Sequence, residues 1–100
     1  MKPYLEKLIR SVGELRKILQ RLDPDEGIRV NSVNDGSKCY TFVARKGDRY
    51  TVNTAQKVYD RSLKAYVPGG EETWFHTSDI EEALAKIMQD AERPLRAYSY

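Results

Sequence analysis

The side chains of this chain that could act in catalysis are few. Cys39 is its only cysteine and His76 its only histidine. A thiol and an imidazole together could provide a nucleophile and its base. However, Cys39 alternates with Thr41 and Val43 in a pattern that predicts burial, and a buried thiol is usually inert. We therefore expect no catalytic pair and no enzymatic activity.

Metal ligands are equally scarce. One cysteine and one histidine supply two soft ligands, whereas a structural zinc site needs four. Asp23, Asp25 and Gly27 form a D-x-D-x-G run like the start of a calcium loop. An EF-hand needs Gly at the sixth position and Glu at the twelfth, which are Ile28 and Asn34 here. We expect an acidic turn, with neither a metal nor another cofactor.

A cluster of carboxylates at Asp79, Glu81 and Glu82 could in principle support acid–base catalysis. It follows Ser78, and residues 78–81 match a capping box. In this motif the side chain of each end residue accepts a hydrogen bond from the backbone N–H of the other. Acidic residues in a first turn also interact favourably with the helix dipole. The cluster therefore predicts a helix that is capped by Ser78.

Basic and tyrosine side chains are interleaved through the middle of the chain, a pattern that suits binding. Proteins that bind single-stranded nucleic acids combine a positive groove with aromatic platforms on a sheet. The alternative is a solvated strand surface whose Lys and Arg side chains discourage edge pairing. The candidate nucleic-acid-binding residues are Lys38, Tyr40, Arg45, Lys46, Arg49, Tyr50, Arg61 and Lys64.

The charges are divided into blocks that the formal net charge of +2 hides. Residues 1–22 carry six bases and two acids (+4), and residues 28–67 carry eight bases and three acids (+5). Residues 71–92 carry seven acids and one base (−6). Segregated charge of this kind favours partners of opposite charge.

Length and composition indicate one domain. One hundred residues with 40% hydrophobic and 32% charged side chains fall in the globular range. A lone cysteine excludes an internal disulfide and fits a reducing compartment, so we expect a cytoplasmic protein. No stretch is apolar enough for a membrane span, and residues 1–22 are too charged for a signal peptide.

Two amphipathic helices are expected, one near each end of the chain. Within residues 1–22 the large apolar residues follow the 3-4 spacing of a heptad seam. The seam consists of Leu5, Leu8, Val12, Leu15, Leu19 and Leu22. The second helix should run from Ser78 to Pro94 with an apolar stripe of its own. We expect Leu15 and Leu19, near the centre of the first helix, to be buried.

Between the helices the pattern predicts five antiparallel strands, at residues 28–33, 38–46, 49–54, 57–67 and 73–77. Gly47 and Asp48 fit a two-residue hairpin loop, which pairs Val43 with Val52. Residues 68–71, with the sequence PGGE, predict another turn.

The order α-β-β-β-β-β-α predicts a two-layer α+β domain with an antiparallel meander sheet of about five strands. The domain should span residues 1–94, and residues 95–100 should form a short tail. Both helices could cover one face of the sheet, or one could cover each face. The strand at 38–46 is apolar on both sides, because Tyr40 and Phe42 oppose the buried set, so its second side is either covered or meets a partner.

These features predict a small, non-enzymatic binding module that uses a basic, tyrosine-bearing sheet surface for single-stranded or duplex nucleic acid. The alternative is a protein–protein adaptor or inhibitor that docks through this sheet or through the acidic C-terminal helix. The broad apolar stripe and the opposite charges of the two helices also predict a homodimer. One contiguous basic face would favour nucleic acid, whereas bases paired with acids would favour a protein partner.

Overall fold

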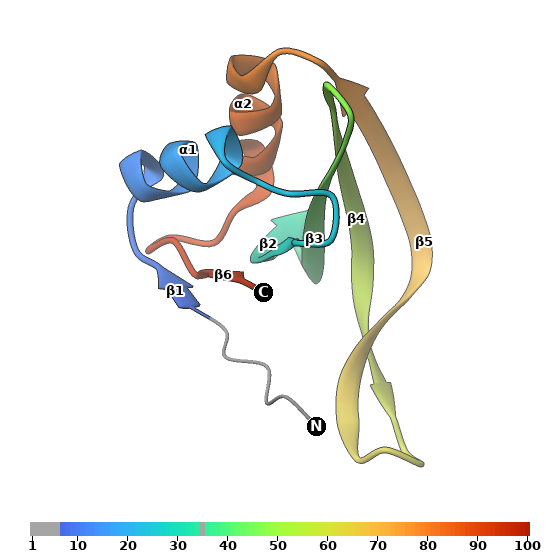
Figure 1. The fold of residues 1–100 in the computed structure, drawn as a ribbon. Helices are drawn as coiled ribbons and strands as arrows, with labels where there is room; N and C mark the ends of the chain where they lie inside the picture. The colour runs from blue at the N-terminus through green and yellow to red at the C-terminus, as the bar shows by residue number, and fades with distance from the viewer. Residues whose placement is uncertain (1–6, 35) are drawn as a thin grey trace, which may run out of the picture.

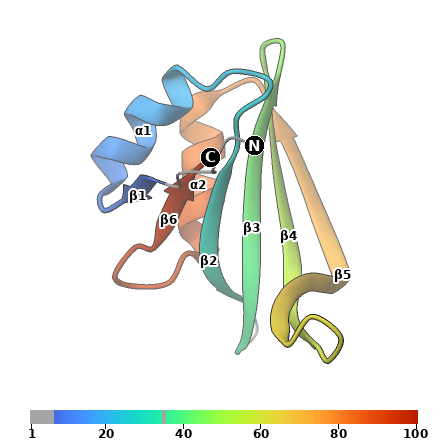
Figure 2. The same ribbon diagram turned by 60° about the horizontal axis from the view of Figure 1, so that its bottom comes forward.

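A six-stranded antiparallel sheet carries both helices on one of its faces (Figure 1; Figure 2). The computed structural model describes residues 7–34 and 36–100. The sheet order is β1-β6-β2-β3-β4-β5. The fold class is confirmed as α+β, with six strands rather than five. The elements are β1 (Lys7–Ile9), α1 (Val12–Gln20), β2 (Ile28–Asn34), β3 (Ser37–Lys46), β4 (Arg49–Asp60), β5 (Ala65–Thr77), α2 (Ile80–Asp90) and β6 (Ala97–Ser99).

Helix α1 begins at Val12, so the helix predicted within residues 1–22 is wrong over residues 7–11. Ser11 caps α1, and its Oγ accepts the N–H of Glu14 at 3.2 Å. The heptad seam extended the prediction across this cap, although a Ser followed three residues later by Glu is itself a start signal. Leu5 lies outside the described residues.

Two short strands that the sequence pattern does not predict complete one edge of the sheet. Residues 7–9 form β1, and residues 97–99, expected to be part of a tail, form β6 between β1 and β2. Ile9 and Ala97 are paired and fully buried, whereas Leu8 is exposed. Only one side of β1 therefore joins the core.

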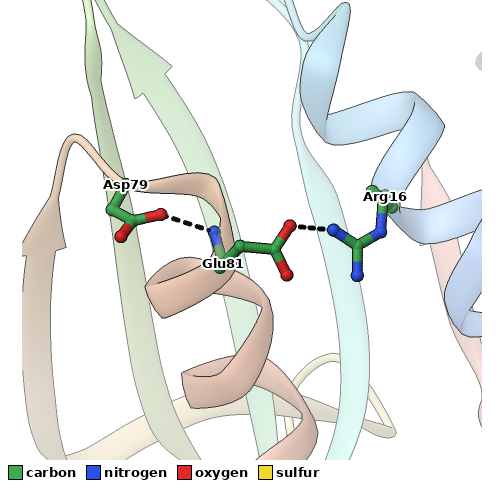
Figure 3. A network of polar contacts seen from close by, with 3 residues as sticks. All are labelled: Arg16, Asp79 and Glu81. Carbon is green, nitrogen blue, oxygen red and sulfur yellow. Dashed lines mark hydrogen bonds and ion pairs between the residues drawn. The ribbon is translucent and has the colours of Figure 1, made fainter.

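The hydrophobic core fills the space between the two helices and one face of the sheet. Leu15 and Leu19 are fully buried, as predicted. Glu81 of α2 forms an ion pair with Arg16 of α1, which brings the two helices together (Figure 3). The core side chains are Leu15 and Leu19 of α1, Leu22 just after it, Ala83, Leu84 and Ile87 of α2, and Ile9, Ile28, Val30, Val43, Tyr50 and Val52 of the sheet, together with Ala91 and Ala97.

The hairpin between β3 and β4 has the predicted register, since Val43 pairs with Val52 and Gly47 has a φ of +60°. The next turn lies at residues 61–64, which were predicted to be strand. There Asp60 accepts the N–H groups of Ser62 and Leu63 at 2.8 and 3.1 Å. This side-chain turn divides the predicted fourth strand between β4 and β5.

The predicted turn at residues 68–71 is wrong, because these residues lie within β5. A bulge shifts the register between Ala55 and Gln56, and Gly70 accommodates it with a φ of +67°. Pro68 is tolerated because β5 is the edge strand, where a missing N–H breaks no ladder on the outer side. Glycine and proline here mark a bulge and not a chain reversal.

Helix α2 begins one residue later than predicted. Its N-cap is Asp79 and not Ser78, because the Asp79 carboxylate accepts the N–H of Glu81 at 2.9 Å (Figure 3). Thr77 supports the cap, since its Oγ1 accepts the Asp79 N–H at 3.0 Å. The ion pair of Arg16 with Glu81 then joins this first turn to α1, and both side chains are exposed. Such a pair contributes at most about 1 kcal/mol.

That ion pair also bears on the predicted homodimer. The attraction between a basic first helix and an acidic second helix was one reason to expect self-association. In the structure the two helices are neighbours within one chain, so this attraction is at least partly satisfied without a second copy. In the described part of the chain, the helices are all too short or too polar to cross a membrane.

Candidate functional site

The face of the sheet that the helices leave uncovered carries most of the large aromatic side chains. On β3 the side chains of Cys39, Thr41 and Val43 are buried on the helix side, so Tyr40 and Phe42 point away from the helices. No helix of the described residues covers this second side (Figure 2). We call it the helix-free face.

Rings and cations alternate across the helix-free face. The guanidinium carbon of Arg29 lies 4.8 Å from the ring centroid of Tyr98 and 6.0 Å from that of Tyr40. The ammonium of Lys57 lies 5.0 Å from the Tyr40 centroid and 5.7 Å from that of Tyr66. These distances are those of cation–π contacts. We call the series Tyr98, Arg29, Tyr40, Lys57 and Tyr66 the cation–aromatic ladder.

The ladder follows from the register of the sheet. Its five members come from β6, β2, β3, β4 and β5, which are neighbours in that order. Arg29 and Tyr98 are directly paired, whereas Tyr40 is paired with Ala55. Lys57 lies two residues beyond Ala55 on the same face, and long side chains reach diagonal neighbours of this kind. The small side chain of Ala55 leaves room for that contact.

Three rings on this face, those of Trp74, Tyr66 and Tyr59, are largely exposed. Trp74 is 59% exposed and stacks on His76 at a centroid distance of 6.4 Å. Tyr66 is 58% exposed and meets Tyr59 edge to face at 5.2 Å. These exposed rings can accept a planar group from solution, whereas Tyr40 is half-buried between its two cations.

Tyr50 was expected to share this surface, and the structure places it elsewhere. It lies on the helix side of the sheet, is 5% exposed, and its hydroxyl donates to the Leu19 carbonyl at 2.9 Å. Arg45 lies over the Tyr50 ring at 5.5 Å and donates from Nε to the Gly47 carbonyl. Tyr50 is therefore a core residue and cannot stack on a nucleobase.

The other predicted basic residues divide between two ends of the sheet. Lys46 and Arg49 flank the β3–β4 turn, whereas Arg61 and Lys64 lie in the turn between β4 and β5. These turns are at opposite ends of the 12-residue strand β4, roughly 40 Å apart for an extended strand. The structure does not bring these groups together. Of the predicted set, Tyr40 belongs to the ladder and Lys38 lies beside its Lys57 end.

Most of the ladder was not among the eight predicted site residues. Lys57 and Tyr66 belong to the interleaved basic and tyrosine pattern but were not selected from it, Arg29 lies in a predicted strand, and Tyr98 lies in the expected tail. Lys57 could have been found, because it follows Ala55 at a two-residue spacing once the β3–β4 register is known. Tyr98 and Trp74 had no such signal, since their positions depend on a distant strand pairing and on the bulge.

The helix-free face is basic. By strand register it carries five basic side chains, Arg29, Lys38, Lys46, Arg49 and Lys57, against the carboxylate of Glu72 on β5. The ion pair of Arg16 with Glu81 lies on the other side of the sheet, with the helices. By this register, positively charged side chains outnumber carboxylates on this face.

The groups considered for catalysis and metal binding are not assembled. Cys39 lies on the helix side, where burial and, to a smaller extent, the charge of Asp90 raise the pKa of its thiol. His76 lies on the other face, with Nδ1 at 3.2 Å from Thr51 Oγ1. Within residues 7–34 and 36–100, no three His, Cys, Asp or Glu side chains are grouped as a metal site would require.

Comparison with known proteins assigns the chain to no family. No protein-family model matches it, and no curated protein or solved structure does so either. Its function must therefore be inferred from the geometry of the helix-free face.

Proposed function

We propose that the protein binds single-stranded nucleic acid on the helix-free face of its sheet and catalyses no reaction. The observation that carries this proposal is the cation–aromatic ladder, which crosses five neighbouring strands. Proteins that bind single strands pair positive groups for the phosphates with rings for the bases, often on an open sheet. Both components are present on this face.

The ladder has a physical advantage for binding phosphates. Arg29 and Lys57 each lie between two rings, so their charged ends are held near fixed positions before a ligand arrives. Less side-chain entropy is then lost when a phosphate binds. The exposed rings of Trp74, Tyr66 and Tyr59 are available for bases, each worth about 1–3 kcal/mol when a base stacks on it.

The exposed rings also favour a single strand over a duplex. In a duplex the bases are already stacked and paired, so rings such as Trp74 would have no base face to contact. Phosphate contacts alone would remain, and these do not require aromatic side chains. We therefore expect the single strand to bind more tightly than a duplex of equal length.

An adaptor function is the second candidate, and one observation favours it. Trp, Tyr and Arg, which dominate this face, are also the residues enriched in the energetic centres of protein–protein interfaces. The salt dependence distinguishes the two. Release of counterions from a nucleic acid gives a linear fall of log affinity with log salt, at about 0.7 per phosphate contact on single strands.

The experiment is a titration of a labelled single strand of random sequence, and of the matched duplex, by fluorescence anisotropy at several salt concentrations. Trp74→Ala should weaken binding about 5- to 150-fold with little change of salt slope. Lys57→Gln should lower the slope by about 0.7. Lys17→Gln is the matched control, because Lys17 is exposed on α1 at the other side of the sheet.

Two results would contradict the proposal. The first is no binding of the single strand at 50 mM salt, which would leave the adaptor as the better candidate. The second is an equal loss of affinity in Lys17→Gln and Lys57→Gln, because this would show attraction by overall charge and no role for the ladder.

A further inference from the structure

A pocket opens at the end of the cation–aromatic ladder. Strand β4 pairs with β3 only as far as the Cys39–Gln56 pair, and beyond it β4 pairs with β5 alone. The fork between the start of β3 and this β4–β5 arm contains a pocket of about 410 Å³. Small-molecule sites occupy roughly 300–1,000 Å³. The pocket is lined by Ser37, Lys38, Gln56, Lys57 and Tyr66.

The lining suits an anion with several oxygens. Lys38 and Lys57 bring two ammonium groups with three donors each, and Ser37 and Gln56 add a hydroxyl and an amide. The described residues that line the pocket include no carboxylate. Lys57 is also the last cation of the ladder, so the pocket and the ladder share one charged group.

The charge of the pocket favours a terminal phosphate over one within a strand. A phosphate monoester carries a charge of about −1.5 to −2 near neutral pH. A phosphodiester carries one negative charge. Two lysines match the monoester better, and the exposed ring of Tyr66 forms a wall against which the adjoining base can lie.

The bulge in β5 shapes this pocket. Gly70 has a positive φ, and a Cβ at this position would collide with the side-chain amide of Gln56. The glycine therefore allows Gln56 to pack against the bulge while it lines the pocket. This gives the PGGE sequence a role in the pocket as well as in the strand.

We propose that the pocket binds the terminal phosphate of a nucleic-acid strand, with Lys38 and Lys57 on the phosphate oxygens and Tyr66 against the terminal base. This proposal rests on the proposed function. It gives the strand a fixed end, from which the remaining nucleotides follow the ladder toward Tyr98. The protein would then recognise strand ends and not only strand length.

The test compares one short oligonucleotide in three forms: unphosphorylated, 5′-phosphorylated and 3′-phosphorylated. We expect one phosphorylated form to bind the wild-type protein at least about tenfold more tightly than the unphosphorylated form, a preference that identifies the end that is recognised. Lys38→Gln should remove most of this preference, so that the phosphorylated and unphosphorylated forms bind the variant with nearly equal affinity. Lys38 is exposed, so this change should leave the fold intact. Lys17→Gln should keep the full preference.

The outcomes separate the pocket from the proposed function. Equal affinity for all three forms would overturn the pocket and leave single-strand binding standing. A preference for a phosphorylated form that persists in Lys38→Gln would also contradict the pocket proposal, because the terminal phosphate would then bind elsewhere on the protein. If no form binds at 50 mM salt, the proposed function fails and the pocket proposal fails with it.

Discussion

Replacement of Tyr50 by phenylalanine separates the stability of this fold from its binding surface. The change removes one hydroxyl and keeps the ring, which is packed between the sheet and α1. In the structure that hydroxyl donates to the carbonyl of Leu19 at 2.9 Å. Without it the carbonyl retains a longer bond from the Leu22 N–H, at 3.4 Å. We expect a loss of about 0.5–1.5 kcal/mol in the free energy of unfolding, the net value of such a bond.

Thermal and urea melts measure this loss. For a domain of this size 1 kcal/mol corresponds to about 4–8 °C in Tm, so Tyr50→Phe should melt about 2–12 °C lower. The urea midpoint should fall with an unchanged slope, because the surface exposed on unfolding is the same. Binding of a single strand should not change, since Tyr50 lies on the helix side of the sheet.

Tyr66→Phe is the matched control, because it also removes one phenolic hydroxyl, from a ring that is 58% exposed. Its stability should stay within about 0.5 kcal/mol of the wild-type value. Our reasoning would be refuted if Tyr50→Phe melted like the wild type. It would be refuted equally if Tyr50→Phe weakened binding of the single strand and left Tm unchanged, because the ring would then lie on the binding surface.

The remaining predictions concern the core, a helix cap, the thiol and the oligomeric state. Leu19→Ala should lower the free energy of unfolding by about 2–5 kcal/mol, since its side chain is fully buried, and an unchanged urea midpoint would contradict this. Asp79→Ala should lower the free energy of unfolding by about 0.5–2 kcal/mol, and Ser78→Ala should lower it by less than about 0.5 kcal/mol. If melts gave the opposite order, Ser78 and not Asp79 would be the N-cap of α2. Burial raises the pKa of Cys39 above its ordinary 9.0, so the folded state holds this proton more tightly than the unfolded state does. The stability that the protonated thiol contributes to the folded state is therefore fully present below pH 9.0 and is lost as the pH rises above this value. Between pH 8 and pH 10.5 the free energy of unfolding should fall less in Cys39→Ser than in the wild type. The predicted homodimer should sediment with twice the mass of one chain at micromolar concentration, and a single-chain mass at high concentration would exclude it.

Local sequence patterns were sufficient to predict those parts of the fold whose contacts join residues close together in the sequence. The two-residue loop at Gly47 fixed the register of β3 and β4, because a tight hairpin leaves no freedom in pairing. The 3-4 spacing identified Leu15 and Leu19 as core residues, because one face of a helix must pack on the sheet. Strand β6 could not be found in this way, since three residues are stabilised only by strands distant in sequence.

The candidate site shows the same limit. Tyr40 was placed correctly on the side of its strand opposite the buried residues, although the sequence left open whether this side is covered. The predicted hairpin register already paired Tyr50 with Arg45, on the side of Val43 and Val52, and this should have removed Tyr50 from the binding set. Tyr50 was selected because it is a tyrosine among basic residues, although the alternation of side chains along β4 placed it on the buried side. The ladder itself depends on the neighbouring positions of β6 and β2, which no local pattern indicates.

The placement of β6 between β1 and β2 has a consequence for the order of folding. Lys7 pairs with Ser99, so β1 has no hydrogen-bonded strand until residues from the other end of the chain have arrived. Bringing β1 and β6 together closes a loop of nearly the whole chain, which costs conformational entropy. We therefore expect this pairing to form late, after the β2–β5 meander. Substitutions in β1 and β6 should accordingly speed unfolding and leave the folding rate nearly unchanged. During synthesis the edge of β2 would stay unpaired until β6 has been made, and other chains could pair with it in that time. Misassociation through this edge should therefore be most frequent before β6 is added to the sheet.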